Sequence, residues 1–209
     1  MIDRSVIEMK RAFLEELRSL VKAGLLTEED LVRYTKTNTH AYLVHCALEA
    51  GRRADYLAIP DYKVKFKSGY RLPGRSKPRL FAKVDVAYFS KGDWRLEGVA
   101  ECFTIDEADH ALESTADERV PRDRERLMHL IGRREDILSA RESEIKFALI
   151  VTVLPRRVKE KPYWTDELRK APRDFYSWFK GSWEDLVNQL SKAGCRAELI
   201  VITEETIKS

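Results

Sequence analysis

The chain has 209 residues, of which 44% are hydrophobic and 35% charged, with a net charge of +3 at pH 7. This balance excludes a disordered chain and predicts a compact domain with one sizeable core. The longest apolar run, at 147–154, is too short to cross a bilayer, and the first residues lack the apolar segment of a signal peptide. We therefore expect a cytoplasmic protein without membrane contact.

The cysteines agree with that expectation, and the amide content indicates the kind of source organism. The three cysteines, Cys46, Cys102 and Cys195, are widely spaced and form neither a disulfide framework nor a zinc motif, which favours a reducing compartment. The chain has two asparagines and one glutamine. Depletion of thermolabile amides beside abundant Glu, Lys and Arg is typical of proteins from thermophiles.

Helical periodicity dominates the first quarter of the chain. Three helices are predicted there, over 6–21, 27–34 and 39–50. "TEED" at 27–30 fits a capping box. Gly24 and Gly51 follow apolar helical runs and are predicted C-caps, and Asn38 is a predicted N-cap.

The rest of the chain alternates between strands and helices. Five strands are predicted, at 56–66, 81–89, 94–103, 145–154 and 197–203. Two helices are predicted between them, at 121–139 and around 183–190. This order predicts an α/β fold in which helices flank a mixed central sheet with an αβββαβ core. We divide the chain into a helical N-terminal extension at 1–38 and a single domain at 39–209.

Two of the predicted strands each carry an unexpected acid. The stretch "FAKVDVAYFSKGDWRLEGVAECFT" (81–104) places Asp85 in one apolar strand and Glu101 in the next. Burying a carboxylate is costly unless it is paired or binds a metal. A turn near 91–93 would bring the two acids together, where they could bind one Mg²⁺ or Mn²⁺. The alternative is that each acid pairs with a nearby Lys or Arg.

The order helix, strand, "VDVAYF", turn, "GVAECF", helix, strand resembles the PD-(D/E)xK nuclease superfamily, the fold of type II restriction enzymes and archaeal Holliday junction resolvases. The resemblance covers residues 39–203. It implies that Asp85 and Glu101 bind the metal and that the backbone carbonyl of Cys102 is a further ligand. It also implies a metal-dependent DNA endonuclease acting on branched or structured DNA, working as a homodimer.

The resemblance fails at one position of the motif. The third strand of these enzymes carries Glu-x-Lys, and Phe103 stands at the lysine position here. Phe cannot orient a water or stabilise developing charge. Lys83 lies two residues before Asp85, on the same strand face, and we expect it to supply the catalytic ammonium. Alternatively, Lys83 only neutralises Asp85, a basic residue of the first strand or of the 121–139 helix substitutes, or the site no longer cleaves.

The first core helix holds a candidate for an additional ligand. Other members of the superfamily place an acid near the start of this helix. Glu49 is its only acid and lies near the end, whereas His40 lies near the start and could take that place. The alternative is an ordinary surface or packing histidine.

A basic segment leads into the strand of Asp85. Between Lys63 and Lys83 there are eight basic residues and no acidic one. They are Lys63, Lys65, Lys67, Arg71, Arg75, Lys77, Arg79 and Lys83. The first three alternate with apolar residues and so leave one face of a strand. Such a density suits contacts to DNA phosphates. The alternative is an edge strand protected by lysine.

Three functions therefore remain open. The first is the metal-dependent endonuclease, and the second is a catalytically inactive nucleic-acid-binding protein on a nuclease fold. The third is a helix-turn-helix transcription regulator that uses the first three helices. Because the 39–50 segment is mainly apolar, we expect it to be a core helix and not a recognition helix.

Overall fold

A computed structural model describes residues 2–27, 39–70, 77–104, 120–132, 137, 144–153 and 172–208. The helices are α1 (Ile2–Lys22), α3 (Thr39–Arg53), α5 (Val120–Gly132), α7 (Pro172–Lys192) and α8 (Glu204–Lys208). The strands are β1 (Tyr56–Tyr70), β2 (Arg79–Ser90), β3 (Leu96–Phe103), β4 (Phe147–Val153) and β5 (Arg196–Ile202). The predicted helix at 27–34 lies almost wholly outside the described residues, and Asn38, Arg71 and Arg75 lie outside them as well.

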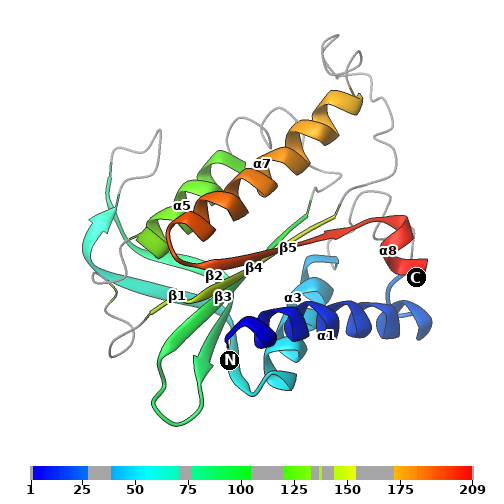
Figure 1. Cartoon of the computed structure of the whole chain (residues 1–209), viewed down its shortest axis with the longest axis horizontal. Helices are drawn as coiled ribbons and strands as arrows, with labels where there is room; N and C mark the ends of the chain where they lie inside the picture. Colours follow the sequence, from blue (N-terminus) through cyan, green and yellow to red (C-terminus); the bar gives the residue numbers. More distant parts are fainter. Residues whose placement is uncertain are drawn as a thin grey trace.

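The strands form one mixed sheet in the order β1-β2-β3-β4-β5. β1, β2 and β3 are antiparallel neighbours, whereas β4 is parallel to both β3 and β5. α1 and α3 cover one face of the sheet, and α5 and α7 cover the other (Figure 1). The predicted α/β fold, with its mixed sheet and its order αβββαβ from α3 to β4, is confirmed.

Each face of the sheet buries its own apolar core, and both cores draw on every strand. We call them the α1–α3 core and the α5–α7 core. The α1–α3 core includes Phe13, Leu17, Leu43, Cys46, Ala58, Val86, Tyr88, Ala100, Cys102, Phe147 and Ile200. The α5–α7 core includes Val64, Phe66, Val84, Ala87, Val99, Phe103, Leu127, Ile150, Trp183 and Ala197. No helix in the described ranges is long and apolar enough to cross a membrane.

Gly51 corrects one sequence prediction. It was expected to cap α3, but the helix continues through it to Arg53. A Cβ atom at Gly51 would lie 2.4 Å from Cε1 of Tyr88, whose hydroxyl donates a hydrogen bond to the Ala47 carbonyl at 2.9 Å. Gly51 therefore serves close packing and not capping. Gly24 does follow its helix with a positive φ angle, as predicted, and Gly194 follows α7 in the same way.

One helix boundary differs from the prediction, and one helix was not predicted. The helix predicted at 121–139 ends at Gly132, and Ile137 instead forms an isolated antiparallel bridge with Phe66 of β1. The short helix α8, which follows β5, was not predicted. Apolar spacing alone could not separate Ile137 from the helix because a single apolar residue fits either periodicity.

We expect Gly51→Ala to lower the free energy of unfolding, measured by urea denaturation. Overpacking costs about 1–3 kcal/mol, and the gain in helix propensity of about 1 kcal/mol offsets only part of it. Gly181→Ala in α7 is the matched control, since nothing lies within 4 Å of a Cβ atom there, and it should raise stability. Equal stabilisation by both variants would contradict the close approach of Tyr88.

Candidate functional site

The candidate site lies where β2 separates from β3. The described pairs of β2 with β3 run from Phe89–Leu96 to Val86–Ala100, where the ladder ends. Asp85 is the next residue of β2, and its Oδ2 accepts a hydrogen bond from the Cys102 amide at 2.7 Å. The side chain thus supplies an acceptor to a strand amide where the ladder ends. We call this place the strand fork, formed by Asp85 and Cys102.

β1 and β2 both change their buried face at the level of the fork. Ile59 and Tyr62 of β1 both pack on the α5–α7 core, and so do Val84 and Ala87 of β2. On each strand these two residues are three positions apart, whereas regular alternation places residues of one face two positions apart. The shift lies between the register pairs Pro60–Val86 and Tyr62–Val84. Asp61 lies in this interval of β1 with φ of 52°, a left-handed conformation that Asp tolerates better than most residues.

Asp85 faces the start of α3. The Nε2 atom of His40 lies 3.3 Å from Asp85 Oδ2, as expected if His40 belongs to the site. The hydrogen bond to Asp85 raises the pKa of His40; burial opposes the shift, the charges of Asp85 and Asp61 add to it, and Lys83 opposes it. His40, Asp61, Lys83 and Asp85 therefore form one charged group, which we call the α3-side cluster.

Lys83 belongs to this cluster through an ion pair with Asp61 and not with Asp85, the partner considered as an alternative to its catalytic role. Its Nζ lies 2.7 Å from Oδ1 of Asp61, and both side chains are more than half exposed. An exposed pair of this kind contributes little to stability and separates readily. Lys83 thus lies on the strand of Asp85, but its described ion pair is with β1.

Glu101 faces the opposite side of the sheet. Its neighbours Ala100 and Cys102 belong to the α1–α3 core, so alternation directs Glu101 towards α5. There its Oε1 accepts a short hydrogen bond from Nη2 of Arg126, whose Nη1 lies 3.3 Å from Asp123. Glu101 is 7% exposed, and its Oε2 has no hydrogen-bond partner within the described residues. For Glu101 this arrangement matches the alternative of pairing with a nearby Lys or Arg, whereas the described partners of Asp85 are His40 and the Cys102 amide.

The two strand acids therefore lie on adjacent strands but do not share a site. The side chains that pair with them come from α3, for Asp85, and from α5, for Glu101, and these helices cover opposite faces (Figure 1). No group of three or more His, Cys, Asp or Glu within the described ranges could hold a metal. As arranged here, Asp85 and Glu101 do not fit the two-carboxylate Mg²⁺ or Mn²⁺ site predicted from the sequence.

Phe103 and Cys102 are part of the packed interior. The ring of Phe103, at the expected lysine position, lies 5.1 Å from that of Trp183 in the α5–α7 core. Burial, and then the charge of Asp85, raises the pKa of the Cys102 thiol well above its usual value. The Cys102 amide, and not the carbonyl predicted as a ligand, is the group described in contact with Asp85.

Beyond the fork, β1 and β2 continue as a two-stranded ribbon, which we define as residues 62–70 and 79–84. In Figure 1 these strands curve away from the rest of the sheet. Lys63 lies opposite Lys83, and Lys65 lies opposite Phe81. Because Val64 and Ala82 face the α5–α7 core, these four side chains lie on the other face, the side of Asp85. The exposed basic residues of this region are Lys63, Lys65, Lys67, Lys77, Arg79 and Lys83.

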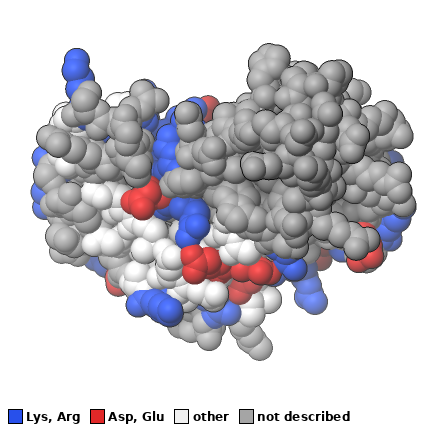
Figure 2. All heavy atoms as spheres, turned by 90° about the horizontal axis from the view of Figure 1, so that it is seen from above, with Lys and Arg blue, Asp and Glu red and all other residues white. Residues whose placement is uncertain are grey.

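The α5 and α7 side has a different charge pattern. Arg124 pairs with Asp185 at 2.5 Å, and Lys180 lies 3.5 Å from Glu184. Figure 2 looks onto this side, and basic and acidic side chains lie close together on its described surface. Arg124 and Lys180 are therefore weaker candidates for phosphate contacts than the basic residues of the ribbon.

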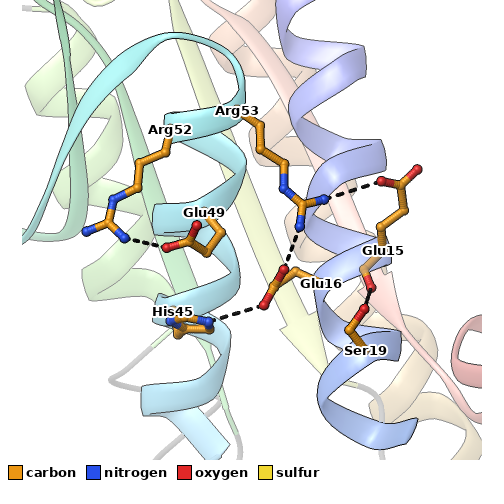
Figure 3. Close-up of polar contacts among 7 residues, drawn as sticks. All are labelled: Glu15, Glu16, Ser19, His45, Glu49, Arg52 and Arg53. Carbon is orange, nitrogen blue, oxygen red and sulfur yellow. Dashed lines mark hydrogen bonds and ion pairs between the residues drawn. The ribbon is translucent and has the colours of Figure 1, made fainter. Parts of the chain in front are cut away.

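α3 is joined to α1 by charged contacts along its other side (Figure 3). Glu16 of α1 accepts a hydrogen bond from Arg53 at 2.7 Å and lies 3.3 Å from Nε2 of His45. On the sheet side, Leu43 and Ala47 of α3 are fully buried. This packing agrees with a core role for α3 and leaves little of the helix to read base edges.

Comparison of the chain with protein-family models, curated proteins and solved structures finds no match. The features from which a function can be inferred are the ribbon, the α3-side cluster and the Glu101–Arg126 pair.

We expect Arg126→Met to destabilise the protein by about 3–5 kcal/mol, because it leaves the Glu101 carboxylate buried without its cation. Arg124→Met removes a pair to the exposed Asp185 and should cost at most about 1 kcal/mol. Denaturant unfolding of both variants measures the difference. Similar stability of the two would show that Glu101 does not depend on Arg126.

We expect the His40 pKa, measured by NMR titration, to lie above 6.5 and to fall in Asp85→Asn. Because folding raises this pKa, the His40–Asp85 contact stabilises the fold fully below the unfolded pKa and loses that effect as pH rises through the folded pKa. The loss in free energy of unfolding caused by Asp85→Asn should therefore become smaller as the pH rises. Glu101→Gln is the control, since Glu101 faces α5, and an equal pKa shift there would contradict the opposite-face arrangement.

Proposed function

We propose that this chain is a nucleic-acid-binding protein, with the basic face of the ribbon as its binding surface. The observation that carries the proposal is the alignment of Lys63, Lys65 and Lys83 on one solvated face of two paired strands. The sequence from Tyr62 to Val84 contains no acidic residue. Cations grouped in this way release counterions when they meet a phosphate backbone, which drives binding.

Edge-strand protection accounts for part of the same pattern, since β1 is an outer strand of the sheet. Within the ribbon β2 is also an edge strand, because its described ladder with β3 ends at the pair Val86–Ala100, so edge protection applies to its basic residues as well. Arg79 and Lys83 extend the positive face onto this second strand. What favours phosphate binding is that the cations of both strands lie on one face, where a single phosphate backbone can contact them together.

The binding surface ends at the α3-side cluster. Lys83 and Asp85 are two residues apart on one strand and share a face, so a strand of nucleic acid along the ribbon would pass close to Asp85 and His40. At this end of the ribbon, Lys83 pairs with Asp61 of β1. Phosphate would compete with Asp61 for Lys83, which gives this end of the surface an exchangeable contact.

A second candidate is the metal-dependent endonuclease that the superfamily resemblance implies. The pairing of Asp85 with His40 next to the ribbon favours it, because both are possible metal or water ligands beside bound phosphate. Such an enzyme would use Mg²⁺ or Mn²⁺ as its Lewis acid, but only one of the two predicted carboxylates, Asp85, lies on the ribbon side, so the site as arranged does not fit the ion. Glu101 would have to leave Arg126 to take part, since it is buried against α5 as described. A homodimer would be expected of a resolvase-like member.

We expect Lys65→Ala to weaken binding to all DNAs and to reduce the slope of log affinity against log salt by about one unit, measured by fluorescence anisotropy. Lys192→Ala is the control, since Lys192 is an exposed lysine in the last turn of α7. The DNAs are linear, supercoiled, single-stranded and four-way-junction molecules, each with and without Mn²⁺.

Salt-dependent binding without cleavage is the result expected of the proposed function. Cleavage that requires Mn²⁺ and is lost in Asp85→Asn and Lys83→Ala would establish the second candidate instead. Absence of salt-dependent binding to any of the four DNAs would overturn both.

A further inference from the structure

An exposed aromatic ring lies among the lysines of the ribbon. Phe81 of β2 is opposite Lys65 in the register, and the ammonium of Lys63 lies 5.2 Å from the centre of its ring. Phe81 is 41% exposed, whereas Ala82, the next residue along β2, is buried. The ring is therefore held on the solvated, basic face of the ribbon.

A single exposed apolar side chain needs no special explanation on a protein surface. The surroundings of Phe81 are what distinguish it. Lys63, Lys65 and Lys83 are its neighbours across and along the strands, and this part of the sequence has no acid. Cations beside an exposed ring provide the two contacts that single-stranded nucleic acid uses, one for phosphates and one for the flat face of a base.

We infer that the ribbon binds unpaired nucleotides, with one base stacked on Phe81 and the adjoining phosphates on Lys63, Lys65 and Lys83. This inference rests on the proposed function and narrows its substrate to nucleic acid with exposed bases. In a continuous duplex each base face is covered by the next base pair, so no base face is available to stack on Phe81. Stacking on a protein ring requires an unpaired strand, an end or an opened junction.

We expect Lys63 to contact the Phe81 ring in the free protein and a phosphate in the complex. In the free protein its ammonium lies over the Phe81 ring, a cation–π contact. A phosphate is a stronger partner for an ammonium than a ring, and the flexible lysine stem allows the exchange. Movement of Lys63 onto a phosphate uncovers the ring for the base. Phosphate binding and base stacking are therefore coupled at this pair.

The test compares Phe81→Ala with two controls. Phe81→Tyr keeps an aromatic face, and Leu80→Ala removes an apolar residue that is 60% exposed but lies on the opposite face of β2. Each variant is titrated by fluorescence anisotropy against a labelled oligothymidine of about 16 nucleotides and against a duplex of the same length. An oligouridine of that length serves as a second single strand.

We expect Phe81→Ala to weaken binding to at least one of the single strands by about 5- to 100-fold, the effect of losing one base–aromatic stack. Its salt slope should stay unchanged, because no charge is removed. Duplex binding should change less than about twofold, and Phe81→Tyr and Leu80→Ala should both bind single strands like the wild type.

Two results would overturn the inference. Wild-type affinity of Phe81→Ala for both single strands would exclude stacking on this ring, and an equal loss on duplex would show that the ring has only a structural role. If Lys65→Ala still weakens binding in that case, the proposed function stands and only the substrate assignment fails. If neither single strand nor duplex binds the wild-type protein, both fail together.

Discussion

Side-chain alternation along β3 determines what chemistry this sheet can carry. Ala100 and Cys102 fill the α1–α3 core, so Glu101 between them has to face α5. A shift by one residue would place the carboxylate in the other core and turn two small buried side chains out of theirs. β3 is held between β2 and β4 in the middle of the sheet, so this register is strongly constrained. The half-buried guanidinium of Arg126 follows from it, because a buried carboxylate at this position needs a cation.

The departure of β2 from β3 explains the other strand acid. A strand that leaves its neighbour abandons backbone donors, and a buried amide without an acceptor is costly. Asp85 supplies the acceptor for Cys102, which allows β1 and β2 to continue without β3. A two-stranded ribbon is marginally stable by itself, and Val64 and Phe66 anchor this one to the α5–α7 core. One face is thereby packed and the other is left for solvent or a ligand.

Much of the fold could be predicted because it depends on periodicity. The order of helices and strands, and the hairpin that makes Asp85 and Glu101 neighbours, follow from apolar spacing and a turn. The face that each acid takes could not be predicted, since the change of face at Asp61 is a backbone irregularity without a sequence pattern of its own. Gly51 was misread for a related reason: a glycine after an apolar helical run fits a C-cap and a close approach equally well.

The site residues divide in the same way. The cations of the ribbon and the possible place of His40 could be recognised locally, from alternation and from position in a helix. The partner of Glu101 depends on how α5 lies across β3, which no local pattern specifies. Phe81 was overlooked because an aromatic residue at the start of a strand ordinarily indicates core. Its neighbours on both strands, Arg79, Lys83 and Lys65, were the available signal that its face is solvated.

The thiol of Cys102 gives the strand fork a reporter of its own motion. Burial raises the pKa of both Cys102 and Cys46, the latter to about 12, so neither is a reactive thiolate in the closed structure. Alkylation of Cys102 therefore has to wait until β2 and β3 part far enough to admit water and reagent. Its rate would measure how often the fork opens, a local equilibrium separate from global unfolding. A ligand that holds the ribbon against the sheet would slow that exchange, and one that pulls it away would accelerate it.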